Sequence, residues 1–261
     1  MTDRIITLKE GRIGRIVFNN PDKLNAISLD MWEGLGRAVD QFEADPEIRV
    51  IVVTGAGEKA FIAGADVSKY EEERMGENAQ EHYAQTGERG LSALYHSTKT
   101  TIAAINGYCY GGGISVAVCC DIRIGSETAQ FAQPALLYGI GYRYKSLRRL
   151  TDIVGIAATK ELLLGGMVWD AEDALRKGML AKVLPAAELQ PFVEKTARRA
   201  ADGAPLTAAQ CKYTINTIAK DPDQRDLDRC EEMFLDCYAS EDYREGIRAF
   251  AEKRTPAFHG R

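Results

Sequence analysis

The sequence predicts an α/β protein with a strand-rich amino-terminal core and a helical carboxy-terminal region. Short apolar runs bounded by turn residues recur between residues 4 and 133. From residue 144 onward the apolar residues recur mainly at helical spacing. The length of 261 residues suits one domain, or one core with a helical appendage. We therefore expect a core over residues 1–195 and a helical region over residues 196–261.

The first elements are predicted as a hairpin, a helix and a buried strand. Residues 4–18 alternate apolar and polar side chains around a turn, which is typical of a β-hairpin. Ser28 is expected to cap a helix, because apolar residues follow at helical spacing as far as Phe42. Residues 49–54 form a short apolar run that ends at a glycine, as a buried strand does.

The rest of the core is predicted from the same signals. Residues 69–90 are polar, show weak helical periodicity, and are expected to form a mobile surface segment. We then expect a buried strand at residues 100–106, a glycine-rich loop at 107–113 and an apolar helix at 114–120. Two short strands are expected at 121–125 and 130–133.

The second half is predicted to be mostly helical. Helices are expected at residues 144–153, 157–164 and 171–177, followed by a strand at 181–184. Residues 186–253 are predicted as helices with breaks near residues 204–205, 222 and 240, where proline or serine interrupts the pattern.

Composition and charge exclude several functions. The net charge of −5 argues against general nucleic-acid binding. No apolar run approaches the roughly 20 residues that span a bilayer, so we expect no membrane partner. The six cysteines and three histidines are not spaced for a metal site. Reduced cysteines and an amino terminus without a signal-peptide pattern predict a cytoplasmic location.

Two glycine-bearing loops, at residues 61–66 and 106–113, are candidates for chemistry. Each follows a predicted strand and leads into a helical segment, whose first N–H groups lack helical partners and attract negative charge. Two such donors converging from different loops would form an oxyanion hole. Taken alone, each loop is also compatible with a tight packing turn. A dinucleotide site is excluded because the G-x-G-x-x-G spacing is absent, and residues 55–59 are too short for a phosphate-binding P-loop.

Four segments carry a family resemblance. The sequences AFIAGAD at residues 60–66 and AAINGYCYGGGISVAVCCDIRIGSETAQFAQP at residues 103–134 resemble the crotonase superfamily, also called the enoyl-CoA hydratase/isomerase family. NNPDKLNAIS at residues 19–28 and FAEKRTPAFHG at residues 250–260 are similar to further segments of that family. The motifs occur in the family's order and span nearly the whole chain.

The resemblance implies a spiral core of ββα units and carboxy-terminal helices that build homotrimers, often paired into homohexamers. It also implies that the N–H groups of Ala65 and Gly112 bind the oxygen of an acyl-CoA thioester. The implied contacts to coenzyme A are Lys23, Leu24, Ala26 and Ala63. Lys253 is a candidate for the CoA phosphates, sometimes from a neighbouring subunit, and is equally compatible with a solvated lysine. No cofactor is implied beyond the coenzyme A of the substrate, and no metal.

The sequence departs from the hydratases of this family at two positions. Ser115 and Ala135 stand where those enzymes carry the glutamates that hold the attacking water. Neither side chain can replace a carboxylate base near neutral pH, which argues against ordinary two-glutamate hydration. Tyr142 stands where the related methylmalonyl-CoA decarboxylases carry a tyrosine that orients the substrate carboxylate. Arg143 and Lys145 could bind an acyl carboxylate, although we expect them at the surface.

Three further polar side chains have both a catalytic and a plainer interpretation. Glu88 and His82 lie in the polar segment expected to flank the acyl pocket, where a lone ionisable side chain is usually solvated. Ser115 lacks the G-x-S-x-G context of a serine hydrolase. The sequence thus predicts an enzyme that forms a thioester enolate, with isomerase, decarboxylase or hydrolase activity, and hydration by substitute groups stays open. The alternative is a catalytically silent CoA-binding or scaffold paralogue.

Overall fold

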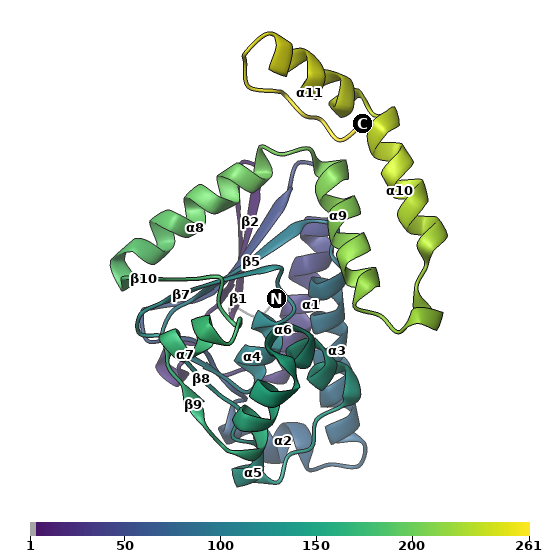
Figure 1. The fold of residues 1–261 in the computed structure, drawn as a ribbon. Coiled ribbons are helices and arrows are strands. Elements are labelled where there is room, and N and C mark those ends of the chain that lie inside the picture. Colours follow the sequence, from purple (N-terminus) through teal and green to yellow (C-terminus); the bar gives the residue numbers. More distant parts are fainter. Residues whose placement is uncertain (1–3) are drawn as a thin grey trace.

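Two β-sheets with helices packed around them form the core of the chain, which the computed structural model describes from residue 4 to residue 261 (Figure 1). The larger sheet has the order β1-β2-β3-β5-β7-β10. Its strands are β1 (Ile5–Glu10), β2 (Ile13–Phe18), β3 (Val50–Gly55), β5 (Thr100–Ile105), β7 (Ile122–Ser126) and β10 (Lys182–Leu184). The β1–β2 pair is antiparallel and the other pairs are parallel, which confirms the predicted hairpin.

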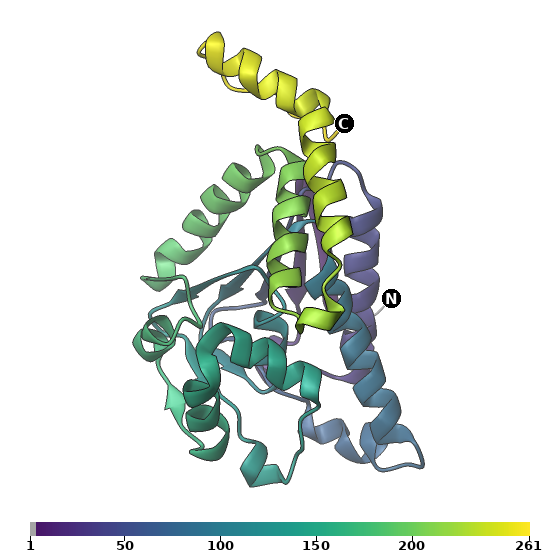
Figure 2. The same cartoon turned by 45° about the vertical axis from the view of Figure 1, so that its right-hand side comes forward.

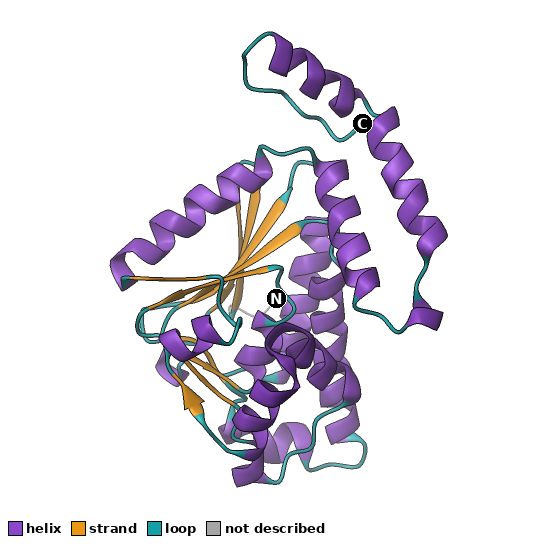
Figure 3. Cartoon of the chain, viewed as in Figure 1, coloured by secondary structure: helices purple, strands orange, loops and turns teal. Residues whose placement is uncertain are grey.

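The smaller sheet has the order β4-β6-β8-β9. Its strands are β4 (Ala60–Ala63), β6 (Tyr108–Tyr110), β8 (Gln130–Ala132) and β9 (Val168–Trp169). β4, β6 and β8 run parallel, whereas β9 is antiparallel to β8. The strand pairs β3–β4, β5–β6 and β7–β8 each contribute one strand to each sheet, and each is followed by helix (Figure 3). This repeat confirms the expected α/β core of ββα units.

Helices α1 (Leu29–Ala44) and α3 (Ala79–His96) pack closely beside the core. Gly90 lies so near α1 that an added Cβ would stand 3.0 Å from the carbonyl oxygen of Trp32. Residues 69–90, predicted as a polar surface segment with weak helical periodicity, form α2 (Tyr70–Arg74) and most of α3, and α3 buries one face. Glycines supply part of that face, so the apolar signal in the sequence was weak.

The helices that follow the smaller sheet are α4 (Gly112–Ala117), α5 (Ala135–Tyr138), α6 (Tyr144–Leu164) and α7 (Ala171–Arg176). Gly155 interrupts α6 with a φ of 80°, so the two helical segments predicted on either side of it are confirmed. α2 and α5 lie at the same end of the molecule (Figures 1 and 2).

The carboxy-terminal region is helical, as predicted. It consists of α8 (Ala186–Ala201), α9 (Pro205–Ile218), the short turn η3 (Pro222–Gln224), α10 (Leu227–Ala239) and α11 (Glu241–Ala251). α8 covers the larger sheet through Leu189, Val193 and Ala197. The proposed domain division after residue 195 falls within α8 and stays a prediction. α10 and α11 extend away from the core, with α11 farthest from α2 and α5 (Figures 1 and 2). Within residues 4–261, no helix has the length and apolar character needed to cross a bilayer.

Candidate active site

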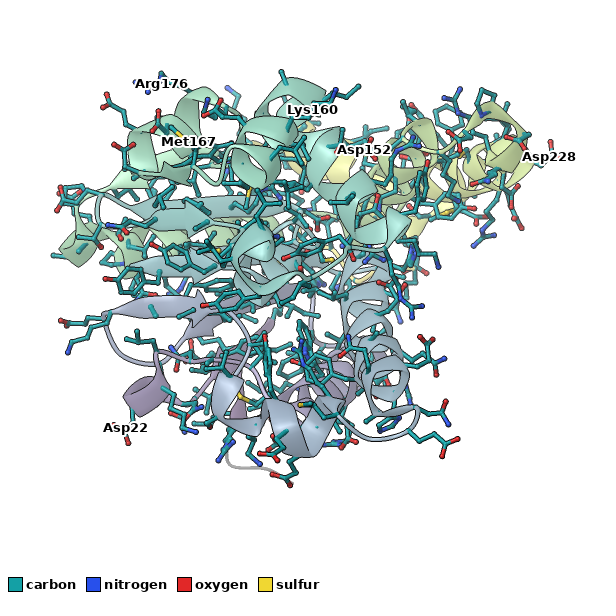
Figure 4. The ribbon with its side chains drawn as sticks, turned by 90° about the horizontal axis from the view of Figure 1, so that it is seen from below. Asp22, Asp152, Lys160, Met167, Arg176 and Asp228 are labelled. Carbon is teal, nitrogen blue, oxygen red and sulfur yellow. The ribbon has the colours of Figure 1, made fainter. Side chains whose placement is uncertain are left out.

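A pocket of about 560 Å³ lies among the loops that join the two sheets to α2, α4 and α5. Figure 4 views the chain from the end that carries α2 and α5, with Asp22 at one margin and Asp228 of α10 at another. Seven of the residues singled out in the sequence line this pocket: Lys23, Leu24, Ala26, Ala63, Ala65, Gly112 and Tyr142. Ser115 and Ala135 line it as well.

Ala65 presents an uncommitted backbone N–H beside the pocket. The residues on either side of it, Gly64 and Asp66, are both hydrogen-bonded to Ile27. The Ile27 N–H donates to the Gly64 carbonyl at 2.8 Å, and the Asp66 N–H donates to the Ile27 carbonyl at 2.9 Å. In a parallel bridge of this kind the residue between those two partners directs its own N–H to the opposite side. No acceptor among the described residues takes the Ala65 N–H.

Gly112 supplies the second uncommitted N–H. It is the first residue of α4, where a backbone N–H has no partner within the helix. Gly111, at φ 50° and ψ −110°, turns the chain into that helix, and this φ favours glycine. The Gly111 N–H donates to Ala132 at 3.0 Å, whereas the Gly112 N–H has no acceptor among the described residues.

The two donor loops approach each other closely. β4 and β6 are adjacent parallel strands, with Ala63 opposite Tyr110, and each donor follows the carboxyl end of its strand. A Cβ added to Gly111 would stand 3.5 Å from the Cα of Gly64. The sheet therefore presents both N–H groups at one edge, on the wall of one pocket.

The loop that carries Lys23, Leu24 and Ala26 is fixed against β4 by a buried asparagine. The Asn25 amide donates to the carbonyls of Ala56 and Ala60, each at 2.9 Å. The Ala63 N–H donates to the Leu24 carbonyl at 3.0 Å. These bonds place the four residues proposed to contact coenzyme A along one wall of the pocket.

Asp66 is the only acidic residue among the described residues that line the pocket, and it is already paired. Lys23 Nζ lies 3.0 Å from one carboxylate oxygen, and the Ser68 hydroxyl donates to the other at 2.6 Å. Burial acts to raise the pKa of Asp66, but the hydrogen bonds from Ser68 and Lys23 outweigh it and hold that pKa below the ordinary value. Asp66 therefore organises the loop as an ionised cap.

Tyr142 is half-buried against the pocket, and its hydroxyl donates to Gln133 Oε1 at 2.8 Å. Burial raises the pKa of Tyr142 above its ordinary value, so the hydroxyl stays protonated at neutral pH. Ser115 lies on the same wall, 3.5 Å from the Gly111 carbonyl. The pocket thus offers hydroxyl and N–H donors where a carboxylate base is absent.

Several candidates from the sequence lie outside this pocket. Glu88 forms a two-pronged ion pair with Arg149, at 2.9 and 3.1 Å, and His82 lines a separate groove. Arg143 pairs with Glu81 at the surface, and Lys145 is exposed, as expected.

Lys253 lies two residues after the end of α11, the helix farthest from α2 and α5 (Figure 1). It does not line the pocket of its own chain. Contact with a CoA phosphate would therefore need a neighbouring copy of the chain, which is one arrangement that the resemblance implies.

Sequence reasoning missed an aromatic and cationic wall of the same pocket. Its members are Trp32, Tyr70, Arg74 and Tyr83. The spacing of Tyr70 and Arg74, four residues apart, places both on one face of a short helix, and this signal was available in the sequence. It was overlooked because the surrounding acidic residues indicated a solvated surface.

Comparison with known proteins identifies the family. The family model described as enoyl-CoA hydratase/isomerase matches residues 9–261. The chain belongs to the enoyl-CoA hydratase/isomerase family.

Relatives within this family share its whole length. The short-chain-enoyl-CoA hydratase of Clostridium acetobutylicum is 33% identical over 97% of this chain and 96% of its own. The carnitinyl-CoA dehydratase of Escherichia coli O157:H7 is 34% identical, with both chains fully covered. The crystal structure of an enoyl-CoA hydratase/carnithine racemase from Magnetospirillum magneticum superposes with a TM-score of 0.93, at 34% identity, covering 100% of this chain and 97% of that one.

Proposed function

We propose that this member of the enoyl-CoA hydratase/isomerase family binds an acyl-CoA thioester and stabilises its enolate with the N–H groups of Ala65 and Gly112. The observation that carries the proposal is the pair of uncommitted N–H groups, delivered by adjacent parallel strands to one pocket. Both donors belong to the backbone, so their positions follow from the fold.

The chemistry follows from the charge that develops on the thioester. When a bond at the α-carbon releases its electron pair, the carbonyl oxygen gains negative charge. Two fixed N–H donors bind that oxygen more strongly as the charge grows, and this lowers the barrier. The donors need no reorganisation, because the sheet and the start of α4 hold them before the substrate arrives.

The side chains of the pocket support a reaction other than ordinary two-glutamate hydration. Ser115 and Ala135 supply no carboxylate, and Asp66 is committed to Lys23 and Ser68. Isomerisation or decarboxylation through a bound enolate is therefore proposed, or hydrolysis through a tetrahedral oxyanion bound by the same two N–H groups. In each case Tyr142 would orient the acyl group by donating a hydrogen bond, since its raised pKa disfavours a role as base.

The proposed CoA contacts are Lys23, Leu24, Ala26 and Ala63, mainly through the backbone. Lys253 is proposed to reach a CoA phosphate from a neighbouring subunit of a homotrimer or homohexamer. α10 and α11 support this assembly, because they expose apolar side chains and extend from the core (Figure 2). In this proposal the backbone N–H groups stabilise the enolate. The proposed chemistry therefore requires no cofactor beyond the coenzyme A of the substrate.

A panel of saturated, unsaturated and carboxylated acyl-CoAs incubated in heavy water tests the proposal. We expect deuterium at the α-carbon, or turnover to a new product, for at least one thioester, detected by mass spectrometry. Binding by calorimetry with neither exchange nor turnover would favour the silent paralogue instead. An absence of binding to every thioester would exclude both.

A further inference from the structure

The pocket contains an arginine that forms no ion pair with a carboxylate of the described residues. Arg74, the last residue of α2, lines the pocket, and its Nε is buried without a hydrogen-bond partner. No carboxylate among the described residues lies within 4.0 Å of its guanidinium. A buried N–H donor without an acceptor is costly, so this half-buried guanidinium is suited to an anion that arrives with a ligand.

Two aromatic rings hold the guanidinium in place. Arg74 Cζ lies 3.8 Å from the ring centre of Tyr83 and 4.2 Å from that of Tyr70. Stacking of this kind fixes the plane of the group and leaves its N–H edge free for a carboxylate. The neighbouring Glu73 carboxylate is directed elsewhere, since it accepts the Leu29 N–H at 3.1 Å and lies 4.0 Å from Lys69 Nζ.

A short series of contacts links this cation to the proposed oxyanion hole. A Cβ at Gly112 would stand 3.4 Å from Trp32 Cζ2. The Trp32 indole N–H donates to the Tyr83 hydroxyl at 2.9 Å, and the Tyr83 ring is one of the two that stack on Arg74. The guanidinium therefore belongs to the part of the pocket beside the thioester carbonyl, whereas Lys23 lies against Asp66 in the loop proposed for coenzyme A.

We infer that the acyl group of the substrate carries its own carboxylate, and that Arg74 binds it. The substrate class is the mono-CoA thioester of a dicarboxylic acid. This inference rests on the proposed function and narrows its substrate. Tyr142 shares the pocket with Arg74 and could donate to the same carboxylate.

Paired ligands of equal chain length test the inference in the full-length protein. Calorimetry compares malonyl-, succinyl- and glutaryl-CoA with propionyl-, butyryl- and pentanoyl-CoA. We expect at least one dicarboxylic thioester to bind tenfold or more tightly than its uncharged counterpart. R74Q should abolish this preference, R74K should restore part of it, and R143Q, which changes an exposed arginine outside the pocket, should leave it intact.

Each other outcome overturns the inference. Equal binding of all three pairs by the wild-type protein would remove it and leave the proposed function standing, whether or not R74Q folds. A tenfold loss of affinity for free coenzyme A in R74Q would assign the arginine to a CoA phosphate instead. Failure of the wild-type protein to bind any thioester would remove the proposed function together with this inference.

Discussion

Gly112 allows one donor of the proposed hole to be removed without deleting a side chain. It is the first residue of α4, a position where proline is tolerated because the N–H lacks a helical partner. Replacing Gly112 with proline should lower the rate of α-proton exchange by ~10²–10³ relative to Gly112→Ala. The alanine variant is the steric control. It keeps the N–H but adds a Cβ, which would stand 3.2 Å from Ile27 Cδ1. Equal exchange rates in the two variants would contradict the hole.

The hydroxyl of Tyr142 can be tested in the same assay. Tyr142→Phe removes the donor to Gln133, and we expect kcat to fall roughly tenfold, as for the loss of one hydrogen bond, with a much smaller change in Kd. Tyr144→Phe is the matched control, because that tyrosine is exposed and lies outside the pocket. A larger effect on Kd than on kcat would assign Tyr142 to binding alone.

The pKa of Tyr142 also predicts how the reaction rate depends on pH. Burial raises this pKa above the ordinary value of 10.0, so the protonated hydroxyl persists to higher pH in the folded protein than in a free tyrosine. The rate should therefore show no loss attributable to Tyr142 as the pH rises from 7 to about 9. A pH–rate profile of wild type and Tyr142→Phe checks this, since any Tyr142 ionisation in that range would appear only in the wild type.

At the scale of elements, carboxylates of α11 hold the carboxy-terminal tail, and Glu245 binds the part of it nearest the helix end. Glu245 accepts hydrogen bonds from Arg254 and Arg248 and from the Ala257 N–H, and these bonds lower its pKa below the ordinary 4.5. Since the folded-state pKa is depressed, the contribution of these bonds is present above pH 4.5 and is lost as the pH falls through the lower folded value.

Glu245→Gln should therefore release the tail at neutral pH. Amide hydrogen exchange at Ala257 should become faster in the variant, while exchange in the strands of the larger sheet stays unchanged. Wild-type protection should persist on acidification to about pH 4.5 and weaken only below it. Unchanged protection of Ala257 in the variant would show that the tail is held without Glu245, by contacts such as those of Asp242 with the His259 and Gly260 N–H groups.

The elements differ in how readily the sequence revealed them. The hairpin and the breaks near Pro205, Pro222 and Ser240 follow from local chemistry and were predicted correctly. The burial of α3 was not predicted, because its contact with α1 depends on glycines that give no apolar signal. The residues that line the pocket were also predicted only where the local sequence reveals them. Ala65 and Gly112 lie in recognisable loops, whereas the role of Arg74 depends on Tyr83, nine residues away on another helix.

At the scale of the whole molecule, α10 and α11 present an apolar surface. Its exposed residues are Phe234, Leu235, Tyr238, Tyr243, Ile247 and Phe250. Phe250 is 87% exposed, which is unusual for a side chain of that size in a folded monomer. We expect Phe250→Asp to shift the protein from trimer or hexamer toward monomer in sedimentation velocity. Leu164→Asp, in an exposed leucine of α6, is the control. A monomeric wild-type protein would refute the proposed assembly.

In the proposed mechanism, the pairing of β4 with β6 sets the separation of the two N–H donors. Neighbouring strands stand ~4.8 Å apart whatever side chains they carry, and the two donors follow their ends. Substitutions around the pocket can therefore change the acyl group and the reaction while the separation of the donors is inherited unchanged. One extra residue inserted between Ala63 and Ala65 would have the opposite effect. It would turn the Ala65 N–H away from the thioester carbonyl, so the protein would still bind its acyl-CoA but would not stabilise the enolate.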